Sequence, residues 1–190
     1  GGLGAVMGSK RIKAIIIDGA SGEKPPIADQ EAFKNARKAY TKALMGHPQT
    51  TTYREYGTAA VARMAQAFGI LPTRNFREGQ FEGLDKISAE QLRENMTTRK
   101  GCDPSHACMA GCTIQSSNVY VTADGETTVS PVEYETIGLM GTNLGIDDLD
   151  AIARMNYVVN DLGLDSIEIG AALGVAADAG LMQFGDGDRG

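Results

Sequence analysis

The sequence predicts a mainly α fold, in which a helical domain with a small β-hairpin is preceded by one strand. Apolar residues recur at helical spacing from about Asp29 and again over 145–163, which predicts amphipathic helices. The Asp124-Gly125 pair within 117–130 is a strong signal for a tight hairpin turn. With 190 residues, the chain suits one domain or one domain plus a piece of another.

The composition is that of an ordinary soluble globular protein, with 42% hydrophobic and 22% charged residues. The net charge of -6 and the scattered Lys and Arg residues argue against nucleic acid as a partner. No apolar run approaches the length of a membrane span, and no signal peptide is visible. Three cysteines, an odd number, disfavour a disulfide framework, so we expect a cytoplasmic protein.

The N-terminal part is expected to contain a turn, a strand and a linker. The glycine-rich segment 1–9 either cradles an anionic group through its backbone N–H groups or is a flexible turn. Residues 11–17 are typical of one strand, and the glycine and prolines of 21–29 stop both helix and strand. We therefore place a domain boundary at 21–29. Because residue 1 is Gly, the chain is interpreted as a piece of a longer protein.

The rest of the chain is expected to be helical apart from the hairpin and a cysteine-containing loop. Ser88, with Gln91 three residues later, forms a capping-box pattern at the start of one helix. Small residues crowd the last helix, so we expect another element or a ligand to pack very close to it. The expected helices are about 29–45, 53–68, 88–98, 132–141, 145–163 and 166–179.

All three cysteines, Cys102, Cys108 and Cys112, fall within eleven residues of a loop rich in turn-forming residues. Thiolates gathered that closely suit zinc, copper(I) or an iron–sulfur cluster. Ordinary buried, reduced cysteines are the alternative, since free Cys is among the most buried residue types. The spacing alone leaves both interpretations open.

Four blocks of the sequence resemble the aldehyde ferredoxin oxidoreductases, a family of tungsten- or molybdenum-pterin enzymes. In chain order the blocks are GGLGAVMGSKRIKAI, the cysteine loop, PVEYETIGLMGTNLGIDDLDAI and NDLGLDSIEIG. The resemblance covers essentially the whole chain and implies an N-terminal β domain that binds the pterin, followed by two mainly helical domains. On that basis residues 1–20 are the end of the β domain. Residues 21–190 are the first helical domain, which carries the cysteine loop and the GLD motif.

The resemblance also implies a 4Fe-4S cluster held by the cysteine loop. The family's C-x2-C-x3-C run places cluster thiolates at Cys108 and Cys112, and its first position falls on Ser105. Cys102 lies three residues before Ser105 and is the remaining candidate metal ligand. Either Cys102 reaches the cluster through a longer loop, or the cluster site is altered or lost.

Two further motifs imply the site of a tungsten or molybdenum bis-pterin. The family's D-x-x-G-L-D motif falls on 160–165, with Asn in place of its first Asp, and Asn can still hydrogen-bond. The P-x-Y-E block places Glu135 beside the metal as the first catalytic candidate, with Glu133 as the second. The expected pterin-binding residues are Gly1, Gly2, Asn160, Gly163, Leu164 and Asp165.

The implied reaction is the two-electron oxidation of a small aldehyde to a carboxylic acid. The cofactor supplies the redox chemistry, and electrons pass singly through the cluster to ferredoxin or a similar carrier. Glu135 would move protons. The implied partners are the remaining domains of the same enzyme, without which these residues are expected to be inactive, and a second copy in a homodimer.

Two other functions stay open at this point. The first is a stand-alone iron–sulfur or zinc-binding module, which needs a complete ligand set within the chain and would take His106 as its fourth ligand. The second is a structural helical domain whose site has decayed, which Ser105 and Asn160 favour because each departs from the family's pattern.

Overall fold

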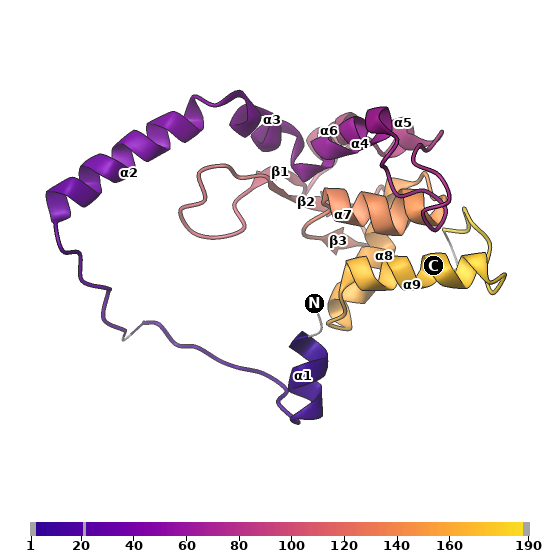
Figure 1. Cartoon of the computed structure of the whole chain (residues 1–190), viewed down its shortest axis with the longest axis horizontal. Helices are drawn as coiled ribbons and strands as arrows, with labels where there is room; N and C mark the ends of the chain where they lie inside the picture. Colours follow the sequence, from indigo (N-terminus) through magenta and orange to yellow (C-terminus); the bar gives the residue numbers. More distant parts are fainter. Residues whose placement is uncertain (1–2, 21, 188–190) are drawn as a thin grey trace. The chain divides into compact units, whose positions relative to one another are not determined.

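The computed structural model describes residues 3–20 and 22–187, and the chain divides into two units, Gly1–Gly46 and His47–Gly190 (Figure 1). The described residues are mainly helical, with one small antiparallel sheet, so the predicted class, mainly α with a small β-hairpin, is confirmed. In the described part of the chain, no helix combines the length and the apolar character that crossing a membrane requires.

The first unit contains α1 (Leu3–Ser9) and α2 (Gln30–Met45). The Asp29 carboxylate begins α2 as its N-cap, accepting hydrogen bonds from two backbone N–H groups of the first turn at 3.0 and 2.9 Å. The helix expected from about Asp29 is therefore confirmed. The glycine-rich segment, expected to be a turn, is helical from Leu3 onward. None of the described residues of these two helices is buried.

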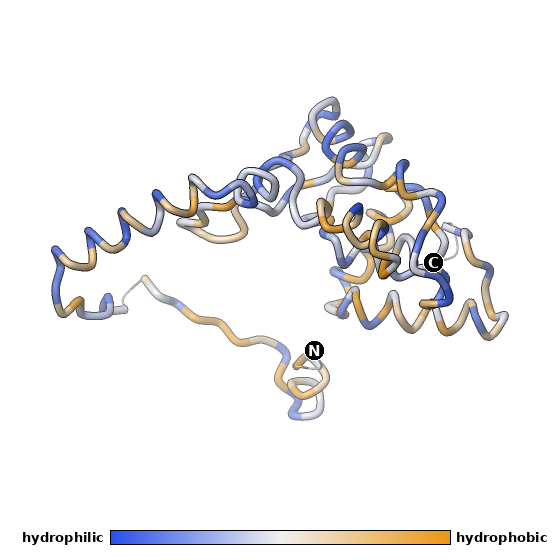
Figure 2. Tube along the Cα trace, turned by 45° about the horizontal axis from the view of Figure 1, so that its top comes forward, coloured by the Kyte–Doolittle hydropathy of each residue, from blue (hydrophilic) through white to orange (hydrophobic). Residues whose placement is uncertain are grey.

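The predicted strand at 11–17 does not form. The segment has no strand partner among the residues that the structure describes, and Ile15, Ile16 and Ile17 are 69%, 92% and 87% exposed. Figure 2 shows it as a hydrophobic stretch of the trace. A strand is stabilised by hydrogen bonds to a neighbouring strand, so an apolar and alternating sequence alone does not make one.

The second unit holds the remaining helices. The single helix predicted over 53–68 is divided at Gly57, whose φ of 63° lies outside the range of right-handed helix. The segment predicted as one short helix, 132–141, is a single α-helical turn followed by a π-helix. The α-helices are α3 (Pro48–Tyr56), α4 (Val61–Phe68), α5 (Leu84–Ile87), α6 (Ala89–Thr98), α7 (Tyr134–Thr136), α8 (Leu149–Asp161) and α9 (Ser166–Asp178); the others are η1 (Thr58–Ala60), η2 (Ile137–Gly141) and η3 (Thr142–Leu144).

Three strands form an antiparallel sheet in the order β1 (Asp103–His106), β2 (Ser117–Val121) and β3 (Thr128–Val129). The predicted hairpin is confirmed as β2 and β3, with the Asp124-Gly125 pair inside the connecting turn. β1 was not expected, because it lies within the stretch assigned to the cysteine loop. It pairs with β2, so the cysteines after it lie in the loop between two paired strands.

One hydrophobic core fills the second unit. Helices α4, α5, α6 and α8 and the sheet contribute buried residues to it, and partly buried residues of α7 and α9 pack against it. α9 lies beside α7 and packs against η2, as the neighbouring yellow and orange helices of Figure 1 show. The largest fully buried apolar side chains are Tyr120, Leu71, Ile87, Leu92, Ile137, Met140, Leu144, Ile152 and Val132.

The crowding of small residues in α9 has the expected consequence, because Gly170 brings the helix against η2. A Cβ built at Gly170 would lie 2.6 Å from the carbonyl oxygen of Leu139. We expect Gly170→Ala to lower the free energy of unfolding by about 1–3 kcal/mol, measured by urea denaturation. Gly138→Ala is the control, since a Cβ there meets nothing within 4 Å. Equal losses in the two variants would contradict this packing.

Candidate functional site

A cavity of about 240 Å³, called the acid pocket here, lies where the loop before α7 meets the facing ends of α8 and α9. Most of its lining residues have polar side chains, and they include three carboxylates and two amides. The lining residues are Pro131, Glu133, Glu135, Thr136, Asn156, Asn160, Asp165, Ser166 and Ile167.

Two buried asparagines hold the loop that enters α7. The side-chain amide of Asn118, on β2, donates to the Val132 carbonyl at 2.7 Å and accepts from the Val132 N–H at 2.9 Å. The Asn156 amide, on α8, donates to the Pro131 carbonyl at 2.8 Å. Because the side chains of Asn118 and Asn156 are nearly fully buried, these hydrogen bonds fix the backbone that carries Glu133.

Glu133 is the N-cap of α7 and lies half-buried at the edge of the acid pocket. Its carboxylate accepts a hydrogen bond from the Thr58 hydroxyl. Burial raises the pKa of Glu133 above its ordinary value. The Thr58 hydrogen bond opposes this, and the neighbouring Glu135 carboxylate adds to it. Near neutral pH, a larger share of Glu133 therefore carries a proton than of an exposed glutamate.

The turn between α8 and α9 brings Asn160 and Asp165 to the same cavity. Gly163, with φ of 69°, ends α8 in the left-handed conformation that favours glycine. The next N–H, of Leu164, returns to the Val159 carbonyl at 2.9 Å. The Asp165 carboxylate then begins α9 as its N-cap, accepting from the Ile167 N–H at 2.9 Å.

The structure thus brings together four of the residues predicted from two separate motifs, namely Glu133, Glu135, Asn160 and Asp165. Gly163 and Leu164 shape the turn but do not line the pocket. The predicted residues Gly1 and Gly2 lie outside the residues that the structure describes.

Sequence reasoning missed several residues of this site, among them Asn156 and Ser166, which line the pocket, and Thr58, which contacts Glu133. Asn156 had a signal, because it is a polar residue at helical spacing between the buried apolar residues Ile152 and Val159. Ser166 directly follows the motif aspartate. Thr58 had no local signal, because it is distant in the sequence from the pocket and contacts Glu133 only in the folded protein.

Cys102 makes different contacts from those of the other two cysteines. Its half-buried sulfur accepts a hydrogen bond from the Val121 N–H of β2 at 3.2 Å, and the residue packs against the core. Ser105, at the family's first ligand position, donates its hydroxyl to the Arg54 carbonyl at 2.9 Å. Both side chains therefore already have partners in the protein.

Cys108 and Cys112 lie together on the loop between β1 and β2, which stands out from the sheet in Figure 1. The Gln115 N–H donates to the Cys112 sulfur at 3.3 Å. That N–H outweighs a small effect of burial and, with the Ile114 N–H and the Cys108 thiol, lowers the pKa of Cys112. A lowered pKa favours the thiolate, which is the form that binds metal.

Across residues 3–20 and 22–187, no three His, Cys, Asp or Glu side chains are grouped in a way that could hold a metal ion. His106, the ligand that the stand-alone module needs, instead has its Nδ1 atom 3.1 Å from an Asp103 oxygen. Of the three predicted thiolate ligands, Cys108 and Cys112 contact each other, and Cys102 instead contacts the backbone of β2.

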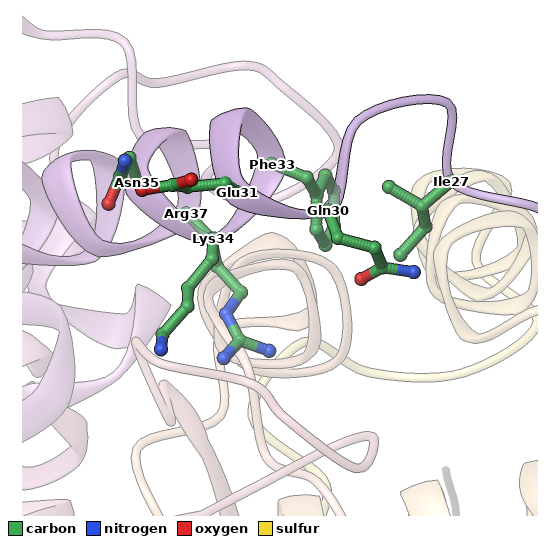
Figure 3. A pocket seen from close by; sticks show the side chains of 7 residues that line it. All are labelled: Ile27, Gln30, Glu31, Phe33, Lys34, Asn35 and Arg37. Atoms are coloured by element: carbon green, nitrogen blue, oxygen red, sulfur yellow. The ribbon is translucent and has the colours of Figure 1, made fainter.

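A second hollow, of about 500 Å³, lies along the first turns of α2 in the other unit (Figure 3). It contains none of the predicted site residues and has one acidic and two basic side chains. Its lining residues are Ile27, Gln30, Glu31, Phe33, Lys34, Asn35 and Arg37.

A protein-family model described as aldehyde ferredoxin oxidoreductase, domains 2 and 3, matches residues 35–183. The chain belongs to this family. The match includes the acid pocket and the cysteine loop, so the resemblance noted in the sequence is confirmed.

Two similar relatives in the aldehyde ferredoxin oxidoreductase family are named tungsten-containing aldehyde ferredoxin oxidoreductase. The one from Thermococcus kodakarensis is 35% identical over 93% of this chain, and the one from Pyrococcus furiosus is 34% identical over 94%. A third relative, named aliphatic sulfonate oxidoreductase, WOR-like subunit, also from Pyrococcus furiosus, is 37% identical over 94%. The chain spans about 28% of the length of each of these relatives.

Proposed function

We propose that this chain is the part of a tungsten- or molybdenum-pterin oxidoreductase that contacts the pterin and the reacting atoms through its acid pocket. The observation that carries the proposal is the convergence of Glu133 and Glu135 with Asn160 and Asp165 on one cavity. The two motifs are separate in the sequence, and the family match covers both. Within the same proposal, residues 1–20 are the end of a pterin-binding β domain and residues 21–190 the helical domain.

The residues of the acid pocket fit the edge of a pterin. Such a ring presents both donors and acceptors, and the pocket offers a carboxylate at Asp165, an amide at Asn160 and a hydroxyl at Ser166. Asp165 and Ser166 are held at the start of α9, and Asn160 is held near the end of α8. The pocket would therefore orient the ring by hydrogen bonds from two helix ends.

When bound, the pterin-held metal supplies the two-electron chemistry. Glu133 and Glu135 lie on the same cavity as Asp165, so they are placed to hold or move a proton near the reacting group. Glu133 suits this role because burial raises the pKa of its carboxyl toward the range where a proton is both held and released. Asn118 and Asn156 keep it in position.

The cysteine loop fits an iron–sulfur cluster only in part. Cys108 and Cys112 provide two neighbouring sulfurs. The Cys102 sulfur, however, is hydrogen-bonded to the backbone of β2, and the Ser105 hydroxyl is hydrogen-bonded to the Arg54 carbonyl. We propose that Cys108 and Cys112 contribute to a 4Fe-4S cluster completed by residues beyond these, and that electrons leave to ferredoxin or a similar carrier. Thiolate ligation is the usual form for such clusters.

An aldehyde is the substrate class that we propose, because the family description and two of the relatives carry that name. The relative named for aliphatic sulfonates is equally similar, so the substrate depends on residues outside what these proteins share.

Asp165 gives the sharpest test of the proposed pterin site. Asp165→Asn in the full-length protein should yield folded protein with at least about ten-fold less bound metal and pterin. The reason is that an acceptor-only carboxylate becomes an amide, half of which donates. As a helix N-cap alone, the same change should cost little, since Asn caps about as well as Asp. Metal content, pterin fluorescence and the thermal stability of the metal-free protein are the measurements.

Asp148→Asn is the matched control for this experiment. Asp148 is the N-cap of α8, where its carboxylate accepts from the Asp150 N–H at 2.8 Å, and it does not line the acid pocket. It should therefore keep full metal and pterin occupancy. Unchanged occupancy in a folded Asp165→Asn protein would leave Asp165 as a helix cap only.

A further inference from the structure

The single hydroxyl of Thr58 makes two hydrogen bonds to the start of α7. Its Oγ1 atom donates to the Glu133 carboxylate and accepts from the Tyr134 N–H at 3.0 Å. A hydroxyl that donates and accepts at once has a fixed orientation. Thr58 is therefore a contact from outside the 131–167 segment that orients the Glu133 carboxyl.

The position of Thr58 is set by a close backbone approach at Gly57. The φ of 63° at Gly57 ends α3 and directs the chain toward α7. A Cβ at Gly57 would lie 2.9 Å from the Ser116 carbonyl oxygen, so the turn lies directly against the end of the cysteine loop. A displacement of Ser116 therefore acts on the backbone that carries Thr58.

Arg54, one turn before Gly57, contacts the same loop at two places. Its guanidinium donates to the Gln115 side-chain oxygen at 2.8 Å, and its carbonyl accepts from the Ser105 hydroxyl at 2.9 Å. The Gln115 N–H in turn donates to the Cys112 sulfur. Contacts thus run from Cys112 through Gln115 to Arg54, and four residues further along the chain Thr58 contacts Glu133.

The charged groups that line the pocket with Glu133 are Glu135 on α7 and Asp165 at the start of α9. Both are acids, so neither favours the ionised form of Glu133. Hydrogen bonds from Thr58 and, more weakly, from Ser117 of β2 are the contacts that favour it. Removal of the Thr58 hydroxyl should consequently be felt directly by the protonation of Glu133.

We propose that Thr58 is a positioning residue for Glu133, and that the Arg54–Thr58 segment couples the state of the cysteine loop to the Glu133 carboxyl. A change in the conformation of the cysteine loop would in this way alter the protonation of Glu133 in the acid pocket. The proposal rests on the proposed function for the use of that proton. Its test needs no bound cofactor, so it can fail independently of the proposed function.

The test measures the pKa of Glu133 in the 190-residue chain by NMR titration of ¹³C-labelled glutamate carboxyls. The Glu133 resonance is identified by its loss in Glu133→Gln. Thr58→Val should raise the pKa of Glu133 by about one pH unit, because it removes a donor to the ionised form while keeping the side-chain shape. Thr58→Ser should restore the original value. A pKa unchanged in Thr58→Val, or raised equally by Thr58→Ser, would overturn the positioning role.

Thr52→Val is the matched control, since the Thr52 hydroxyl donates to the Pro48 carbonyl of its own helix at 3.3 Å. It should leave the pKa of Glu133 unchanged. The coupling is tested by Gln115→Ala, which removes the Arg54 contact without touching the pocket. That change should raise the pKa of Glu133 by about 0.4 pH unit or more, and by nothing further in a Thr58→Val background. Additive shifts, or no shift in Gln115→Ala, would overturn the coupling.

Discussion

Replacement of Cys108 or Cys112 by alanine should reduce the iron content of the full-length protein at least about ten-fold and abolish its visible absorbance. Each variant removes one sulfur of the pair that the loop brings together, and thiolates dominate the ligation of iron–sulfur clusters. Iron analysis and the absorbance spectrum of the purified protein are the measurements. A folded variant with full iron would show that the iron is held by other residues.

Cys102→Ala is the matched comparison, because it removes a thiol from the same stretch of sequence. The Cys102 sulfur is bound to the Val121 N–H, so this variant should keep its iron and lose only a little stability. Loss of iron in Cys102→Ala would instead support the alternative in which a longer loop carries Cys102 to the cluster.

Asp150→Asn should lower the free energy of unfolding by about 3 kcal/mol at pH 7, measured by urea denaturation of the 190-residue chain. The Asp150 carboxylate accepts from Arg99 at 2.6 Å, from the Tyr120 hydroxyl at 2.5 Å and from the Ala123 N–H at 2.9 Å. The side chains of Arg99 and Asp150 are only 23% and 16% exposed. Removal of the acid therefore leaves a largely buried guanidinium without its counter-charge.

The effect of Asp150→Asn should depend on pH with a defined sign. Burial opposes ionisation, but the hydrogen bonds from Tyr120, the Ala123 N–H and Arg99 outweigh it and hold the pKa of Asp150 below its ordinary value. A carboxyl with a lowered folded-state pKa stabilises the fold fully above the unfolded pKa of about 4. This stabilisation is lost as the pH falls through the folded-state value. The gap between wild type and variant should therefore close under acid.

Asp147→Asn is the control for the Asp150 experiment. Asp147 pairs with Lys86 at 2.6 Å, but their side chains are 40% and 69% exposed. Such a surface pair contributes less than about 1 kcal/mol. If the free energy of unfolding fell by a similar amount in the two variants, the Arg99–Asp150 contact would stabilise the fold no more than a surface ion pair does.

Much of the helical fold could be predicted because its signals are local. The apolar spacing of α8, the Ser88 cap of α6 and the Asp124-Gly125 turn each lie within a few residues of the structure they produce. The segment 11–17 has equally clear local signals, yet it forms no strand, because a strand depends on a partner that local sequence does not supply.

Of the candidate site, only the residues that belong to recognisable motifs were predicted from the sequence. Glu133 and Asp165 came from a resemblance, and only the structure puts them on one cavity. The partner of Cys102 is the backbone N–H of Val121, which any residue except proline would present, so no sequence pattern marks it. Thr58 is likewise an ordinary threonine until the turn at Gly57 brings it to Glu133.

The chain order of the acid pocket has a consequence for the way it assembles. All its lining residues lie between Pro131 and Ile167, so the contacts among them close short loops and form at small entropic cost. The Thr58–Glu133 contact joins residues 75 positions apart. Thr58 is synthesised before Glu133, so its contact with Glu133 can form only after the later segment has been made. The orientation of the Glu133 carboxyl therefore depends on a contact that closes a far longer loop than the contacts within the pocket.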